Sequence, residues 1–152
     1  MNTATIETDI SPTDAKKLDD LLWKVLWKPL GLPRDIRNQF RVNGEHLELV
    51  AKDKGQIVGG LVAVWNSNTE VELRHLAVIP NAQNKGMGQQ LISGLVKVVT
   101  PRGCRRIRTI ARNTSVDFFR KAGFRKMPGI APEHLDFKKY GIVFELMEKT
   151  IE

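Results

Sequence analysis

The sequence has 152 residues, of which 41% are hydrophobic and 27% charged, with one cysteine and a formal net charge of +7. This length and balance suit one globular domain, 1–152, and argue against disorder, while the charge favours anionic partners without choosing among them. One cysteine and three scattered histidines exclude an internal disulfide and a structural zinc site, so we expect no metal. Without an apolar run of ~20 residues or a secretory leader, we expect no membrane span and a cytoplasmic location.

The first forty residues predict a short strand and a helix. Residues 3–9 are strand-like, and Ser11 can cap a helix that has Pro12 at its first position. Apolar residues then recur at helical spacing until two prolines and a glycine end the helix. Residues 35–40 predict one further helical turn.

Three strand-like runs follow, over residues 46–52, 56–65 and 69–79. The first two are joined by Asp53-Lys54-Gly55, a hairpin turn sequence. One face of the first run carries Leu47, Leu49 and Ala51. These runs predict an antiparallel meander.

From Gly86 the apolar period changes to that of an amphipathic helix. Residues 105–111 then alternate as a strand, residues 113–122 predict a second helix, and residues 141–148 predict a last strand. Because a helix joins the strand at 69–79 to the strand at 105–111, we expect these two to be parallel neighbours. The expected class is α/β, a mixed sheet flanked by helices.

The segment from Leu76 to Gly88 runs from a buried strand through a polar turn into a helix. The first amides of a helix lack intrahelical acceptors, and its dipole is positive there. Gly86 and Gly88 leave room for a ligand at the backbone, so the segment predicts a diphosphate cradle. A Gly-x-Gly pair alone is expected roughly once by chance in such a composition. Its alternative is a turn without a ligand, and the strand-to-helix context favours the cradle.

The sequence Gln83-Asn84-Lys85-Gly86-Met87-Gly88 resembles the Gln/Arg-x-x-Gly-x-Gly/Ala signature of the GCN5-related N-acetyltransferases (GNAT). Glu72–Val78 resembles the fourth strand of that family, and Ala111–Phe124 resembles its second cofactor segment. The resemblance implies an acyl-CoA N-acyltransferase (GNAT-like) fold with the order β-α-α-β-β-β-α-β-α-β-β and two parallel central strands. It also implies an enzyme that moves an acetyl group from acetyl-CoA directly to a primary amine.

The resemblance places the acyl donor on this sequence. Backbone amides of Gln83 and of Lys85–Gln89 would hold the diphosphate, and the strand backbone of Leu76–Val78 would pair with the pantetheine arm. An N–H group of Ala77 or Leu76 would polarise the acetyl carbonyl. The candidate cofactor-binding residues are Leu76, Ala77, Val78, Gln83, Asn84, Lys85, Gly86, Met87, Gly88, Gln89, Asn113, Phe118 and Phe119.

Acyl transfer to an amine favours a general base, because a lysine-like amine is only about one part in a thousand neutral near pH 7.4. Glu72 matches the general-base glutamate of several family members. Its alternative is a solvated strand residue paired with Arg74. His75 is a second candidate, but strand alternation predicts that it lies on the opposite face from Glu72, as a core or surface histidine.

Two positions depart from the family pattern. Phe119 stands where a tyrosine usually protonates the leaving thiolate, although the Phe118–Phe119 helix would still flank the thiol end of the cofactor. Asn113 lies one residue later than the asparagine that often opens this segment in the family, so that Arg112 occupies the aligned position. We expect Asn113 to cap its helix or to contact the cofactor weakly. Phe119 keeps open an alternative function, an acyl-CoA-binding regulatory or degenerate module without turnover.

The basic stretch from Pro101 to Arg112 has two interpretations. The favoured one is a turn and a strand with one solvated face, and the other is a phosphate or nucleic-acid contact. Since no aromatic residue interleaves the arginines, we do not expect nucleic acid as a partner. Cys104 lies in a turn at the far end of the helix from the cradle, which argues against an acyl-carrying nucleophile. A dinucleotide-binding fold is disfavoured because the third glycine is missing.

The amine acceptor is not identified by the sequence. The resemblance implies that Trp23–Phe40 and Met127–Tyr140 grip it, although aromatic residues in the first segment are more often core. The second reads as a long polar loop in which Glu133 and Asp136 could attract a cationic amine. A homodimer through edge strands is common in the family and is left open.

Overall fold

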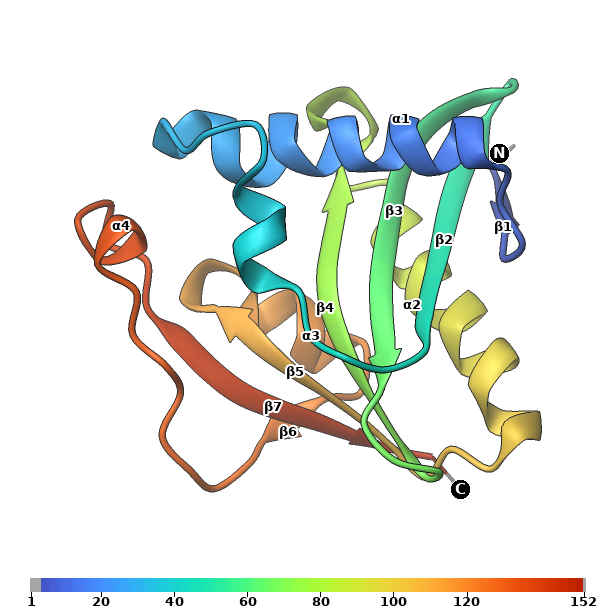
Figure 1. Ribbon diagram of the computed structural model, residues 1–152. Coiled ribbons are helices and arrows are strands. Elements are labelled where there is room, and N and C mark those ends of the chain that lie inside the picture. Colours follow the sequence, from blue (N-terminus) through green and yellow to red (C-terminus); the bar gives the residue numbers. More distant parts are fainter. Residues whose placement is uncertain (1–3, 152) are drawn as a thin grey trace.

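The computed structural model describes residues 4–151 and contains a seven-stranded mixed sheet in the order β1-β2-β3-β4-β5-β7-β6 (Figure 1). Within these described residues, only β4 and β5 are parallel neighbours, as expected. The strands are β1 (Thr5–Glu7), β2 (His46–Asp53), β3 (Gln56–Trp65), β4 (Glu70–Val78), β5 (Arg106–Arg112), β6 (Arg125–Lys126) and β7 (Phe144–Thr150). These strands confirm the expected class and the expected order of the strands, but a helix that was not expected lies between β6 and β7.

Helices cover both faces of this sheet. The α-helices are α1 (Pro12–Leu22), α2 (Met87–Val99), α3 (Val116–Lys121) and α4 (Leu135–Lys138). The helix α1 runs on into a π-helical segment, η1 (Trp23–Trp27), and shorter 3-10 turns are η2 (Lys28–Leu30), η3 (Ile36–Phe40), η4 (Pro80–Ala82), η5 (Thr100–Arg102) and η6 (Asn113–Ser115). Among residues 4–151, no helix is long and apolar enough to cross a bilayer.

Each face of the sheet has its own apolar core. Leu18 and Leu22 of α1 pack with Val50 and Val62 on one face. The other face packs against α2, and its fully buried residues include Leu49, Leu61, Leu73, Leu91 and Leu95. Burying side chains of this size stabilises the fold by about 1.5–3 kcal/mol each. The two cores fix α1 and α2 on opposite sides of β4.

The local signals in the first half of the sequence act as expected. The Ser11 hydroxyl accepts the amide of Asp14 at 3.1 Å and caps α1. Lys54 and Gly55 both adopt positive φ angles, 52° and 79°, in the hairpin between β2 and β3. The expected strand at 3–9 is observed at Thr5–Glu7, and Thr3 lies outside the described residues.

The C-terminal part differs from expectation. The long polar loop predicted at 127–140 contains α4, which is anchored by Phe137 at 3% exposure. The helix ends at Lys138, Gly141 closes the following turn with a φ of 75°, and the Ile142 amide donates to the Phe137 carbonyl at 3.1 Å. The last strand therefore begins at Phe144, three residues later than predicted.

Candidate active site

The parallel strands β4 and β5 pair only along their first halves. Their register runs from Glu70↔Arg106 to Leu73↔Thr109, and the Thr109 hydroxyl donates to the Leu73 carbonyl at 2.9 Å where the pairing stops. Beyond that point β4 continues beside β3, whereas β5 continues beside β7. Figure 1 shows the two strands diverging. One edge of residues 74–78 therefore has no strand neighbour within residues 4–151.

A β-bulge in β4 lies at the start of this opening. On β3, Val62 pairs with His75 while the next residue pairs with Leu73, so that Arg74 is the extra residue. An extra residue reverses the alternation of faces along a strand. Glu72 and His75 therefore lie on the same, α1-covered face, and the predicted opposite placement of His75 is wrong.

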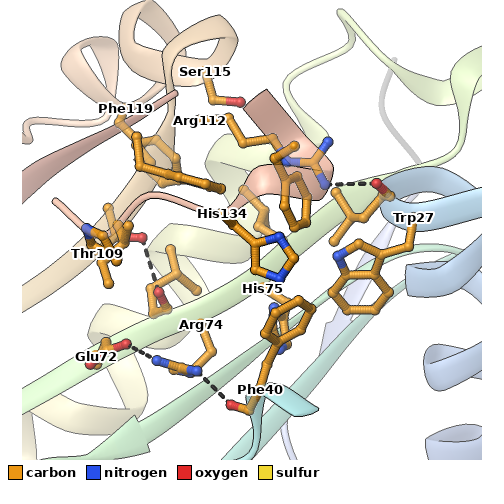
Figure 2. Close-up of a pocket in the computed structure, with 18 of the residues that line it drawn as sticks. Trp27, Phe40, Glu72, Arg74, His75, Thr109, Arg112, Ser115, Phe119 and His134 are labelled. Atoms are coloured by element: carbon orange, nitrogen blue, oxygen red, sulfur yellow. Dashed lines mark hydrogen bonds and ion pairs between the residues drawn. The ribbon is translucent and has the colours of Figure 1, made fainter. Parts of the chain in front are cut away.

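A cavity of about 340 Å³ occupies the opening and is lined by residues from both faces of the sheet (Figure 2). Its walls come from β4, β5, η1, η3, the start of α3 and the segment around α4. Residues that matter for the chemistry below are Trp27, Phe40, Glu72, Arg74, His75, Arg112, Phe119, His134 and Phe137. The structure thus brings together Glu72 and Phe119 from the predicted site with segments 23–40 and 127–140, the expected acceptor-binding segments.

Glu72 is held in place within the cavity wall. Its carboxylate forms an ion pair with Arg74, whose other terminal nitrogen donates to the Phe40 carbonyl (Figure 2). The side chains of Glu72 and Arg74 are 15% and 18% exposed. The expected pairing with Arg74 therefore exists, but in a half-buried cavity wall and not in a solvated strand. The Oε1 atom of Glu72 has no hydrogen-bond donor among residues 4–151.

His75 packs edge-on against Trp27, with 5.0 Å between the ring centres. Burial lowers the pKa of His75 to about 3, and the positive charges of Arg37, Arg74 and Arg112 add to this effect. A neutral imidazole with so low a pKa is a weak base. His75 is therefore a poor candidate for the general base and serves as a neutral part of the wall.

Acidification is expected to destabilise the protein through His75. In the unfolded chain its pKa returns to near 6.5, so the unfolded state binds the proton first and stability falls as the pH drops from 6.5 towards 3. Between pH 7.5 and pH 5 we expect about 2 kcal/mol of this loss. Urea unfolding at both pH values should show a smaller difference in His75→Gln than in the wild type. The exposed His46→Gln is the matched control, and an unchanged difference in His75→Gln would contradict the assignment.

The N-terminus of α2 lies at the exposed end of the same opening. Gly86 precedes it with a φ of 80°, and the first helical bond runs from the Gln90 amide to the Gly86 carbonyl at 3.0 Å. The amides of the first turn have no acceptor within the helix and stand beside a positive dipole end. Asn84 and Lys85 are exposed in the preceding turn. This geometry fits an anion such as a diphosphate.

Gln83 and Gly88 have structural roles that the motif does not reveal. The Gln83 amide already donates to the Pro80 carbonyl at 3.3 Å, and its side chain donates to the Val78 carbonyl at 2.8 Å. A Cβ atom at Gly88 would lie 2.8 Å from the ring of Phe118. Gly88 thus lets α3 pack against α2, whereas the space around Gly86 is open and its backbone angle explains the glycine.

The remaining candidates on β4 and α2 divide between surface and core. Leu76 lines the cavity, while Ala77 is 4% exposed in the core under α1. Val78 packs against the opposite core, as does Met87. The Gln89 side chain reaches the Phe118 carbonyl at 3.4 Å and joins α2 to α3. Cofactor contacts by these residues stay predictions.

Asn113 does not cap a helix. Its side chain bonds the backbone before β7, accepting the Val143 amide at 3.2 Å and donating to the Gly141 carbonyl at 3.4 Å. The chain forms a 3-10 turn before α3, which displaces Asn113 from the capping position. It is exposed and does not line the cavity, so its weak cofactor contact remains a prediction without support from the geometry.

The aromatic residues beside Phe118 form a rigid end to the cavity. Phe119 is 6% exposed and meets Phe118 and Phe124 edge-to-face, at 5.1 Å and 5.2 Å between ring centres. Tyr140 is exposed and is not part of the cavity wall. The position of the usual tyrosine is therefore occupied by a packed phenyl ring.

The arginines of the basic stretch are largely paired with carboxylates. Arg102 forms two 2.7 Å hydrogen bonds with Glu45, and Arg106 pairs with Glu70. These pairs favour the interpretation as a turn and a half-solvated strand. Cys104 is 4% exposed, and burial raises the pKa of its thiol, which disfavours nucleophilic reactivity.

Comparison with known proteins agrees with this geometry. The family model described as the acetyltransferase (GNAT) family matches residues 14–124. The chain belongs to the GNAT family. An uncharacterized N-acetyltransferase of Chlorobaculum tepidum is 28% identical to this GNAT chain over 85 residues, which are 55% of the chain and 54% of that relative. The match thus spans about half the length of this curated relative.

Solved structures resemble this GNAT chain along nearly its whole length. An aminoglycoside 6'-N-acetyltransferase complexed with coenzyme A has a TM-score of 0.77 and 20% identity, covering 97% of each chain. Tetrahymena GCN5 gives 0.72 and 22%, covering 98% of this chain and 96% of its own. A GNAT acetyltransferase from Elizabethkingia anophelis with acetyl-CoA bound gives 0.70 and 16%, covering 99% and 100%. At these identities the likeness shows the shared fold.

Proposed function

We propose that this protein transfers an acetyl group from acetyl-CoA directly to a primary amine. The divergence of β4 and β5 beyond Leu73↔Thr109 is the observation that supports this most strongly. The divergence leaves a free strand edge at residues 74–78, which ends near the α2 N-terminus. This edge borders the cavity that Glu72 lines. Neighbours of the same fold contain coenzyme A or acetyl-CoA.

The residues present fit the acyl donor. The free edge of residues 74–78 would pair with the pantetheine arm, and the amides of Lys85–Gln89 would bind the diphosphate. The Gln83 amide is not part of this set, because it already donates to the Pro80 carbonyl. A backbone N–H of the β4 edge, that of Leu76 or Ala77, would polarise the acetyl carbonyl.

Glu72 would serve as the general base, directly or through water. The amine nitrogen forms the new C–N bond, the C–S bond breaks, the amine proton passes to Glu72 and the thiolate leaves. Arg74 would position Glu72, because it binds one carboxylate oxygen and leaves Oε1 without a donor among residues 4–151. A thiolate leaves readily near neutral pH, so the reaction does not need a proton donor at the position of Phe119.

An acceptor screen tests this function. Release of free thiol from acetyl-CoA is measured with a panel of amines, and each product is identified by its mass. We expect turnover that depends on one class of amine. Tight coenzyme A binding with no turnover for any amine would instead support the second candidate, a binding module without turnover, which the buried Phe119 at the usual tyrosine position favours.

A further inference from the structure

Three arginines alternate along one face of β5, and they differ in their partners. Arg106 and Arg108 both form ion pairs with Glu70 on the neighbouring strand β4. Arg112, two positions beyond Ile110 on the same face, stands opposite Phe144 of β7. No carboxylate of residues 4–151 lies within 4.0 Å of the Arg112 guanidinium. Arg112 is therefore a cation of the cavity wall without an ionic partner.

The contacts of Arg112 hold it in the cavity but do not neutralise it. One terminal nitrogen donates to the Leu26 carbonyl at 2.7 Å, and the guanidinium carbon lies 5.2 Å from the centre of the Phe137 ring (Figure 2). Burial lowers the pKa of Arg112. A guanidinium has five N–H donors, so most remain available to a ligand. A half-buried charge of this kind is stabilised by an anion that reaches it.

The other charges of the cavity are already paired. Glu72 is bound to Arg74, and Glu133, at the exposed rim, lies 3.6 Å from Lys138. The low pKa of His75 reflects burial first and then the positive charges around it, Arg112 among them. The uncompensated charge that a ligand meets in this cavity is therefore positive.

The rest of the wall is aromatic. Ring centres lie 4.9 Å apart between His134 and Phe137, 5.8 Å between Trp27 and Phe40, and 6.2 Å between Phe40 and Phe137. These rings contact one another and form a continuous apolar surface, against which an apolar or aromatic group can pack. The wall therefore combines one site for an anion with a surface for an apolar body.

We propose that Arg112 binds the carboxylate of the acceptor, and that the acceptor is a primary amine with a carboxylate and an apolar or aromatic side chain, such as an apolar α-amino acid. The proposal rests on the proposed acetyl transfer and names its substrate class. The amine nitrogen forms the C–N bond as the C–S bond breaks and the thiolate leaves, Glu72 receives the amine proton directly or through water, and the product is an N-acetylated amino acid. The cationic amine suggested by the acidic residues of the 127–140 segment is not favoured, because Glu133 and Asp136 already lie near Lys138 and His134.

A matched acceptor pair tests the carboxylate directly. When the rates are corrected for the fraction of each amine that is neutral at the assay pH, we expect kcat/KM for L-phenylalanine to exceed that for L-phenylalaninamide by about 10- to 100-fold, the range of one charge-assisted hydrogen-bonded pair. Arg112→Gln should reduce this ratio to near one, and Arg112→Lys should keep part of it. Arg108→Gln, on the same strand face but outside the cavity, should keep the wild-type ratio. A wild-type ratio near one, or a ratio unchanged in Arg112→Gln, would overturn the proposal.

A binding measurement separates this proposal from the proposed function. With coenzyme A present, calorimetry compares 3-phenylpropionate with 3-phenylpropanamide, which lack the amine and cannot be acetylated. We expect the carboxylate to bind at least about tenfold more tightly, and Arg112→Gln to lose this preference. If the carboxylate and the amide bound with equal affinity while amines that lack a carboxylate were acetylated, the role of Arg112 would be overturned and the proposed acetyl transfer would stand. If the protein bound the carboxylate more tightly but acetylated no amine, the role of Arg112 would be supported and the proposed acetyl transfer would be contradicted.

Discussion

Replacing Glu72 with glutamine should lower kcat by about 10²- to 10⁴-fold, the usual contribution of a positioned general base. The amide oxygen of glutamine can still accept a hydrogen bond from Arg74, so the cavity wall should stay intact while the proton acceptor is lost. Affinity for coenzyme A should change little, because the cradle at the α2 N-terminus is untouched. Steady-state rates at saturating acetyl-CoA, with an acceptor found in the screen, check this prediction.

Glu70→Gln is the matched control for this variant. Glu70 lies two residues earlier on β4 and pairs with Arg106 and Arg108, but it does not line the cavity. We expect its loss to leave kcat within a few-fold of the wild type. If Glu72→Gln retained wild-type kcat, or if both variants lost activity equally, Glu72 would be a structural partner of Arg74 and not the base.

Replacing Gly86 with glutamate should weaken coenzyme A binding by about 100-fold. The space around Gly86 is open, so the side chain can be accommodated, but the φ of 80° imposes a backbone cost of about 1–2 kcal/mol on any other residue. The added carboxylate would also compete with the cofactor diphosphate for the amides of the helix start. Calorimetric titration with coenzyme A measures the combined effect.

Gly86→Gln isolates the contribution of charge. It has the same size and the same backbone cost as Gly86→Glu, so we expect its affinity for coenzyme A to be about tenfold higher than that of the glutamate variant at low salt. The difference should shrink as salt is added. Equal affinities of the two variants for coenzyme A would contradict an anion site at this terminus. Wild-type affinity in both variants would contradict any binding of the diphosphate there.

Much of the fold could be predicted because its signals are local. Asp53-Lys54-Gly55 fixed the first hairpin through two left-handed residues, and the change of period at Gly86 marked α2. The crossover through that helix predicted the parallel pair. The helix α4 was missed because its four residues are held by tertiary burial of Phe137, which no local pattern of a polar segment reveals.

The candidate site was predicted in part, and its limits have physical causes. The bulge at Arg74 arises from the register between β3 and β4, and no glycine or proline marks it in the sequence of β4. His75 was therefore assigned to the wrong face. The cavity joins residues far apart in the chain, and their meeting depends on packing. Arg112 could have been noticed as the third cation on one strand face, but its lack of a carboxylate becomes visible only in three dimensions.

Binding of coenzyme A in the opening between β4 and β5 underlies all of these proposals. The most direct test is a titration of isotope-labelled protein with coenzyme A, followed through the backbone amide resonances. We predict saturable shifts concentrated at residues 74–78 and 85–89, with little change along β1 and β2 at the far edge of the sheet. Saturable shifts that leave both segments unchanged and cluster elsewhere, or no saturable shift at all, would contradict the assignment of the site.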